Sequence, residues 1–155
     1  MINSSDWEHL RDVRLEALAD APYAFTSTLE RELAFTEDTW RARCENGASF
    51  IAIEDGAGIG LIGCMKFDET TADEYKIVSM WTRKDFRGSG ISEKLVNITK
   101  QWAREQGADR LYLHVTSDKI AALRFYEKVE FVVPDQRRIS YDPAINACEE
   151  LICLL

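Results

Sequence analysis

The sequence lacks the features that identify membrane proteins and nucleic-acid-binding proteins. Its 155 residues contain no apolar run long enough to span a membrane and no signal-peptide-like start, so we expect a cytoplasmic protein with no membrane partner. Lysine and arginine total 19 against 27 aspartate and glutamate residues, a formal net charge of −8. Phosphate binding needs a clustered basic face, so this balance argues against nucleic acid as a partner and favours a cationic small molecule or peptide.

Metal-binding sequence patterns are missing as well. The only candidate soft ligands are four cysteines with no pair at C-x-x-C spacing and two histidines, namely Cys44, Cys64, Cys148, Cys153, His9 and His114. We therefore expect no metal site. Free cysteine usually packs as a small apolar residue, so we expect reduced and mostly buried thiols.

The chain also has no internal repeat, no low-complexity stretch and no linker between domains. Its composition is that of a globular protein, with 46% hydrophobic and 30% charged residues. A chain of this length can bury a substantial core as one unit. We therefore expect a single domain over residues 1–155.

The first part of the chain predicts two helices. Apolar side chains recur at helical spacing over residues 6–19, and Ser5 with Glu8 has the form of a capping box. A short second helix opens at Thr36 and carries Trp40.

A β-hairpin is predicted after these helices. Between the helices, residues 25–33 are expected to form a loop or a broken helix. The strand-like runs 50–53 and 61–65 then flank a glycine-containing turn at 54–58, which is typical of a hairpin.

The second half of the chain alternates strands and helices. A third strand over 75–82 leads through a glycine-containing loop into an amphipathic helix, which Gly107 ends. A strand, a helix and three short closing strands follow, at 111–115, 119–128, 131–133, 138–141 and 150–154. Antiparallel strands first and a strand–helix–strand unit later predict an α+β fold with one mixed sheet and helices on both faces.

The most informative segment runs from Met80 to Ser92 and joins a strand to a helix through two glycines. Gly88 and Gly90 let the backbone turn tightly so that its N–H groups point inward, and the positive end of the following helix favours an anion there. Arg87 adds a charge-assisted donor. The segment predicts a phosphate site, although the loop alone would fit an exposed turn with a helix cap equally well.

Other nucleotide-binding patterns compete for these glycines and fail. Gly58-Ile59-Gly60-Leu61-Ile62-Gly63 matches G-x-G-x-x-G, but it precedes a strand rather than a helix and so predicts a hairpin. Gly88-Ser89-Gly90 does open a helix, but Glu93 stands where the third glycine belongs and Asp109 precedes its strand. No G-x-x-x-x-G-K-[ST] segment is present, which excludes a P-loop nucleotide hydrolase.

The pattern that survives resembles the GNAT superfamily of N-acetyltransferases, in which a loop of the form Arg/Gln-x-x-Gly-x-Gly/Ala joins a strand to a helix. Arg87-Gly88-Ser89-Gly90-Ile91-Ser92 matches this loop at its first two anchors. Residues 101–108, 111–115 and 122–131 are similar to the helix end, the next strand and the tyrosine-bearing helix of that family. The resemblance covers nearly the whole chain.

The resemblance implies a three-layer fold whose central sheet is mostly antiparallel, with one parallel pair of strands that splay apart. Acetyl-CoA would lie between these strands as co-substrate. Its pantetheine would pair with the backbone of Met80, Trp81 and Thr82, and a backbone N–H near Met80 or Trp81 would stabilise the oxyanion. Its diphosphate would rest on the loop at Arg87, Gly88, Ser89, Gly90, Ile91 and Ser92. Lys119 stands where the family usually has an asparagine that contacts the cofactor.

The resemblance also implies catalytic roles. Tyr126 matches the position of a tyrosine that protonates the departing CoA thiolate, and a core aromatic on the inner face of a helix is the alternative interpretation. Deprotonating a lysine-like amine at neutral pH costs roughly 4–5 kcal/mol, so a base or a water chain is expected. Glu74 is the candidate base, with Glu30 and Glu32 as further candidates. Each carboxylate also fits a solvated surface charge, and His114 fits a side chain packed on the sheet.

Four features depart from the family pattern. Ser92 replaces the final glycine or alanine of the loop and would add a hydroxyl donor, and Lys119 replaces the asparagine. Glu130 stands where family members have glycine, so a turn that needs positive φ would cost about 1–3 kcal/mol. The strand that usually precedes the first helix has no counterpart beyond residues 1–4.

These observations favour an N-acetyltransferase that moves an acetyl group from acetyl-CoA to an amine of an unidentified small-molecule or peptide acceptor, by direct attack in a ternary complex. Two alternatives stay open: a non-catalytic acyl-CoA-binding or regulatory module with the same fold, and an interaction domain without cofactor. The closing strand at 150–154 would allow pairing across a homodimer.

Overall fold

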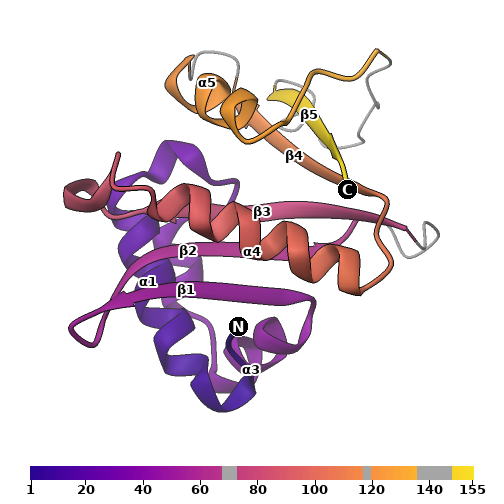
Figure 1. The fold of residues 1–155 in the computed structure, drawn as a ribbon. Coiled ribbons are helices and arrows are strands. Elements are labelled where there is room, and N and C mark those ends of the chain that lie inside the picture. The colour runs from indigo at the N-terminus through magenta and orange to yellow at the C-terminus, as the bar shows by residue number, and fades with distance from the viewer. Residues whose placement is uncertain (68–72, 117–119, 136–147) are drawn as a thin grey trace.

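The computed structural model describes residues 1–67, 73–116, 120–135 and 148–155. Their strands form one five-stranded sheet in the order β1-β2-β3-β4-β5, with helices on both faces (Figure 1). All neighbouring strands are antiparallel except β3 and β4, which are parallel. The predicted α+β fold with a mixed sheet is therefore confirmed.

The chain begins with helices on one face of the sheet. They are η1 (Ser4–Asp6), α1 (Trp7–Asp20), η2 (Pro22–Ala24), α2 (Leu29–Leu33) and α3 (Glu37–Glu45). The predicted capping box of Ser5 with Glu8 is wrong. Asn3 caps instead, because its side chain accepts the Ser5 N–H while Asp6 accepts the Asn3 N–H, and a 3-10 turn then precedes α1.

The predicted hairpin is confirmed. β1 (Ala48–Glu54) and β2 (Ala57–Lys66) are joined by Asp55 and Gly56. Both turn residues have positive φ, 49° and 79°, as tight hairpin turns with the right twist require. The run from Gly58 to Gly63 lies inside β2, so it is a strand and not a nucleotide loop.

The second half follows the predicted alternation. It consists of β3 (Glu74–Thr82), η3 (Lys84–Phe86), α4 (Ile91–Glu105), β4 (Arg110–Thr116), α5 (Ile120–Lys128) and β5 (Cys148–Leu154). The strand predicted at 131–133 is wrong, because only Val132 pairs there, in an isolated bridge with Ile152. The strand predicted at 138–141 lies outside the described residues.

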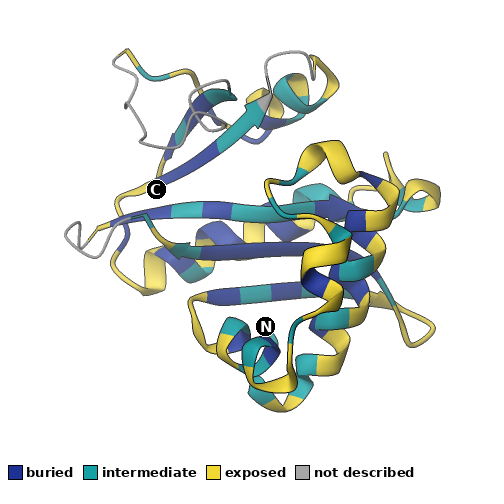
Figure 2. Cartoon of the chain, turned by 180° about the vertical axis from the view of Figure 1, so that it is seen from behind, coloured by how far each residue is buried: buried dark blue, intermediate teal, exposed yellow. Residues whose placement is uncertain are grey.

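Two apolar cores lie on opposite faces of the sheet. Figure 2 shows the buried residues along the strands and on the helices that cover them. One is built by α4 and α5 against the strands and includes the fully buried Phe131 and Leu111. The other is built by α1 and α3 and includes Trp40, which is 1% exposed. None of the described helices combines the length and the apolar character needed to cross a membrane.

The cysteines take no part in disulfides. Cys44, Cys64 and Cys153 are buried and Cys148 is partly buried, as predicted. Burial raises the pKa of the Cys64 thiol to about 12, so this thiol is neutral at physiological pH.

Within the described residues, no strand precedes α1. The N-terminal segment contributes one backbone hydrogen bond, from Ile2 N to Ser49 O at 3.0 Å, and β1 is an edge strand of the sheet.

Candidate functional site

The two parallel strands separate after a short paired stretch. Glu74 to Lys76 of β3 pair with Arg110 to Tyr112 of β4, and no pairing follows along the described strands. In Figure 1 the two strands lie together at one end and diverge toward the other. The predicted splayed pair is therefore confirmed, and the β4-facing edge of the second half of β3 is free of β4.

A β-bulge lies in this separated half of β3. Leu61 of β2 pairs with Trp81, but Gly63 pairs with Val78, so Ser79 and Met80 together oppose one residue of β2. Ser79 has a φ of 58°, which is unusual for a residue with a side chain. Bulges redirect backbone and side-chain groups and are frequent beside active sites.

The loop after β3 presents open backbone at the start of α4. Gly88 and Gly90 have φ of 80° and 87°, and a Cβ added to either would meet no atom within 4 Å. Among the described residues no side chain caps α4, so the first N–H groups of this helix have no side-chain acceptor in that part of the chain. Such N–H groups and the positive end of the helix favour an anion. The loop therefore fits the predicted diphosphate site.

The loop is tied back to the end of β3 by its own side chains. Arg87 Nε donates to the Thr82 carbonyl at 3.0 Å, and the Thr82 and Ser92 hydroxyls are 2.9 Å apart. The hydroxyl that Ser92 adds to the family pattern is thus engaged within the protein. This contact joins the last residue of β3 to the first turn of α4.

Asp20 is a further residue of this site that the sequence did not point to. Its carboxylate accepts a hydrogen bond from the Trp81 indole N–H at 2.9 Å and also pairs with Arg87. The Trp81 N–H and then the Arg87 charge lower the pKa of Asp20, against an opposing contribution of burial. Because Asp20 is 61 residues from Trp81 in sequence, no local motif connects them.

Tyr126 lies on the inner face of α5. It is 8% exposed, and its ring packs edge-on against Phe125 and Phe131. Met80 is packed against the same apolar core. Burial raises the pKa of the Tyr126 hydroxyl above its ordinary value of 10.0. The residue therefore satisfies the core interpretation and is also held in its protonated form.

Glu74 lies at the closed end of the splayed pair. Its Oε1 accepts from the Tyr112 hydroxyl at 3.1 Å and lies 3.4 Å from Arg110 Nη1. Six positions of extended strand separate it from Met80, which corresponds to roughly 20 Å at the usual rise per residue. The structure does not bring these two predicted site residues together.

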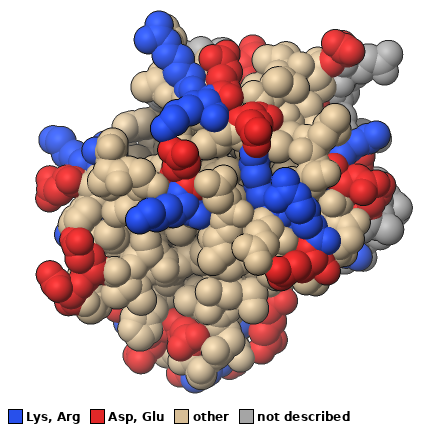
Figure 3. Space-filling model, in the orientation of Figure 1, with Lys and Arg blue, Asp and Glu red and all other residues tan. Residues whose placement is uncertain are grey.

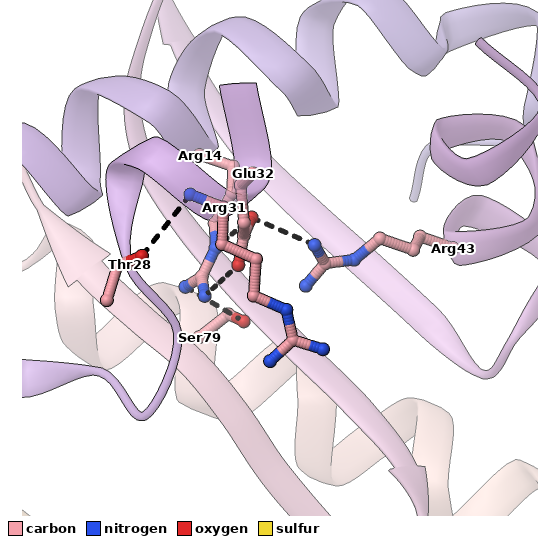
Figure 4. Close-up of polar contacts among 6 residues, drawn as sticks. All are labelled: Arg14, Thr28, Arg31, Glu32, Arg43 and Ser79. Carbon is pink, nitrogen blue, oxygen red and sulfur yellow. Dashed lines mark hydrogen bonds and ion pairs between the residues drawn. The ribbon is translucent and has the colours of Figure 1, made fainter. Parts of the chain in front are cut away.

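Glu32 occupies a buried ion-pair cluster (Figure 4). Arg14 donates to both carboxylate oxygens, at 3.1 and 2.8 Å, and Arg43 donates at 2.8 Å. Burial favours the neutral acid, but Arg14, Ser27 and Arg43 outweigh it and lower the pKa of Glu32 below its ordinary value of 4.5. Glu32 is thus a poor base, whereas Glu30 is exposed to solvent.

The remaining predicted positions have mixed outcomes. Glu130 has a φ of 67°, so the condition for backbone strain at this position is met. Its carboxylate lies 3.1 Å from Lys100 Nζ. His114 is partly buried on β4, where its Nε2 lies 3.5 Å from Glu150 Oε2. Lys119 lies outside the described residues.

On the face that carries α4, Lys and Arg lie interspersed with Asp and Glu (Figure 3). Among the described residues, no group of three or more His, Cys, Asp or Glu side chains is arranged to hold a metal ion.

Several proteins are similar to this chain. N-alpha-acetyltransferase 30 of Schizosaccharomyces pombe is 32% identical over 85 residues, which are 54% of this chain and 56% of that protein. Human N-acetyltransferase 8 is 26% identical over 90 residues, 56% of this chain and 40% of that protein. The chain thus matches about half the length of these curated relatives.

Solved structures show the same fold. The acetyltransferase of GNAT family from Streptococcus pneumoniae superposes with a TM-score of 0.77 at 18% identity, over 99% of this chain and 96% of that chain. The PaiA N-acetyltransferase of Thermoplasma acidophilum, solved in complex with coenzyme A, superposes with a TM-score of 0.70 at 14% identity over the same shares. The profile of the Acetyltransferase (GNAT) family matches residues 10–131, which include the splayed strands, the glycine loop and Tyr126, and the chain therefore belongs to this family.

Proposed function

We propose that this protein is an acetyl-CoA-dependent N-acetyltransferase that acetylates an amine by direct attack in a ternary complex. The observation that carries the proposal is the separation of β3 from β4 after Lys76, directly before a bulge and a glycine loop at an uncapped helix start. An extended ligand with a diphosphate can use both features at once. Membership of the family supports this interpretation.

We also propose that residues 1–155 work as one acetyltransferase unit, because β5 near the C-terminal end completes the sheet that contains the site. The finer expectations of a cytoplasmic location and of a homodimer that pairs through β5 belong to this proposal. Cell fractionation and light scattering test them.

The backbone performs most of the binding in this proposal. Met80, Trp81 and Thr82 offer edge N–H and C=O groups, and the N–H groups from Arg87 to Ser92 receive the diphosphate. A backbone N–H at Met80 or Trp81 donates where negative charge develops on the attacked carbonyl. When bound, acetyl-CoA supplies an activated thioester.

The side chains move protons. Overall, an amide C–N bond forms and a thioester C–S bond breaks, while one proton leaves the amine and one reaches the thiolate sulfur. Tyr126 is the proposed acid, and its raised pKa means that the hydroxyl carries its proton at neutral pH, so that a proton is present to be donated. Glu74 is the proposed base, and its position at the closed end of the splayed strands requires that it act through intervening water.

Acetyl-CoA binding by calorimetry tests the proposal. Gly90→Glu places a carboxylate at the loop, and Gly107→Glu places the same charge at a glycine with similar positive φ and equally open surroundings, at the other end of α4. We expect tight binding by the wild type, weakened at least about tenfold by Gly90→Glu and little changed by Gly107→Glu. Equal losses in both variants, or no binding by the wild type, would refute the proposed site.

Turnover separates the enzyme from the alternative of a non-catalytic acyl-CoA-binding module. With a panel of amines, an enzyme releases free CoA thiol in an amine-dependent manner. A binding module shows acetyl-CoA affinity and no amine-dependent release with any member of the panel.

A further inference from the structure

A cavity lies on the sheet face opposite α4, between α1, α3 and the strands β1 to β3. Its volume is about 220 Å³. The polar part of its lining consists of Arg14, Arg43, Asn46, Ser49 and Ser79. Pockets for drug-sized ligands measure about 300–1,000 Å³, so this cavity suits a molecule the size of a single amino acid.

The charged lining of this cavity is entirely cationic. Arg14 and Arg43 line it, and no acidic residue of the described chain does. Glu32 lies outside the lining and accepts hydrogen bonds from both guanidinium groups (Figure 4). Because two cations share one carboxylate, a positive charge remains beside the cavity, in a chain whose formal net charge is −8.

Arg14 is fixed before any ligand arrives. Its side chain is 6% exposed, and it donates to both oxygens of Glu32 and, from Nη1, to the Ser79 hydroxyl at 3.3 Å. The guanidinium also lies 4.4 Å from the centre of the Phe25 ring. Such a rigid cation costs little conformational entropy when it meets an anion.

Arg43 retains donors for a ligand. Of its five N–H groups, only one on Nη1 has a hydrogen-bond acceptor among the described residues, namely Glu32. The guanidinium lies against the rings of Phe35 and Trp40, at 5.5 and 5.3 Å from their centres. With 35% of its side chain exposed, Arg43 is accessible from solvent. A planar guanidinium group held in this way can bind a carboxylate through two parallel hydrogen bonds.

The cavity also reaches the strand that carries the proposed chemistry. Val78 and Ser79 line it, and they adjoin Met80, where the proposed function places the thioester. Ser79 belongs to the bulge, and its hydroxyl accepts from Arg14. A small acceptor in the cavity would therefore have its anionic end at the arginines and its other end at β3.

We propose that this cavity binds the carboxylate of the acceptor and that the acceptor is an amino acid, with its amine directed to the bulge of β3. The proposal rests on the proposed function and adds a substrate class to it. The acidic surface of the chain is compatible with it, because an amino acid also carries a protonated amine. Arg43 donates the new hydrogen bonds to this carboxylate. Glu32 and Ser79 hold Arg14 in place beside Arg43.

Binding without acetyl-CoA tests the cavity independently of turnover. The probes are N-acetylated amino acids and the matching N-acetylated amino acid carboxamides, which differ only in the carboxylate, titrated by NMR into the full chain. We expect at least one acid to bind about tenfold or more tightly than its carboxamide in the wild type. In Arg43→Gln this preference falls to near parity, whereas Arg43→Lys keeps part of it.

Arg41→Gln is the matched control. Arg41 lies on the same helix, is 40% exposed and pairs with Glu37, but it does not line the cavity. The proposal is overturned if no acid binds, if carboxamides bind equally well, if inorganic phosphate binds as tightly as every acid, or if Arg41→Gln loses the preference as Arg43→Gln does. Acetyl-CoA affinity measured on the same samples shows separately whether the proposed function fails.

Discussion

Asp20, the last residue of α1, forms an ion pair with Arg87 in the loop that precedes α4. The same carboxylate accepts the Trp81 indole N–H at 2.9 Å. One acidic side chain on the first helix therefore connects the end of β3 to the glycine loop. It also neutralises the arginine that the loop would offer to a diphosphate.

Replacing Asp20 with asparagine is expected to strengthen acetyl-CoA binding. The amide oxygen can still accept from Trp81, but the negative charge beside the diphosphate site is gone. We expect about two- to fivefold tighter binding at low salt, with the gain shrinking as salt rises. Calorimetry at two ionic strengths measures it. Asp12→Asn, an exposed charge on the same helix, is the control, and a gain there of the same size would contradict the explanation.

Glu130 is expected to be a strained position. Glu130→Gly relieves the left-handed backbone, worth about 1 kcal/mol. It also loses the ion pair with Lys100, whose side chain is only 4% exposed and whose Nζ also donates to the Val129 carbonyl. Glu130→Ala loses the pair and keeps the strain. Urea unfolding should therefore show the glycine variant more stable than the alanine variant by about 1 kcal/mol. Equal stabilities would mean that the turn is rebuilt.

Tyr126→Phe is expected to lower turnover while leaving acetyl-CoA affinity unchanged. General acid catalysis contributes about 10²–10⁴-fold, so we expect a loss within that range. Steady-state kinetics and calorimetry on one preparation provide both values. A loss of affinity and turnover together would indicate that the ring serves only the core, as would full activity.

Tyr126 is also expected to make the stability of the fold depend on pH in the alkaline range. The folded pKa of Tyr126 is raised above its ordinary value of 10.0, so the folded state binds more protons than the unfolded state above that pH. Its contribution to stability is complete below pH 10 and is lost as the pH rises further. In denaturant melts, the wild type should lose more stability above pH 10 than Tyr126→Phe does.

Breaking the Glu32 cluster is expected to destabilise the fold. Glu32→Gln leaves the buried Arg14 without its carboxylate, which costs about 3–5 kcal/mol in comparable sites. Glu37→Gln removes an exposed partner of Arg41 and should cost less than about 1 kcal/mol. Urea unfolding at neutral pH compares them, and similar small losses in both would show that Arg14 is well solvated.

The same Glu32 cluster predicts how the stability of the fold falls at acid pH. Because the folded pKa of Glu32 is lowered from 4.5, its contribution is present above that pH and is lost as the pH falls through the lower folded value. The wild type should therefore lose more stability between neutral pH and pH 3 than Glu32→Gln does. Parallel pH profiles would contradict this assignment.

Much of the fold could be predicted from local patterns. Apolar strand-like runs and the glycine-containing turn between them located β2 and the hairpin, and the glycine after α4 located the end of that helix at Gly107. The predicted strand at 131–133 failed because the chain there makes one bridge to Ile152 and then leaves the sheet. Residues of the types found at 131–133 favour a strand, but a segment becomes a strand only when a neighbouring strand pairs with it along its length.

The glycine loop and its arginine could be proposed as a site from the sequence, because backbone freedom and charge are properties of short segments. The tyrosine of α5 was proposed from its resemblance to the family position. The tertiary structure alone decided the rest. Asp20 meets Arg87, and Arg14 and Arg43 share Glu32, because helices distant in sequence pack on one face of the sheet. Burial and pairing, which set the charge of each group, arise only from that packing.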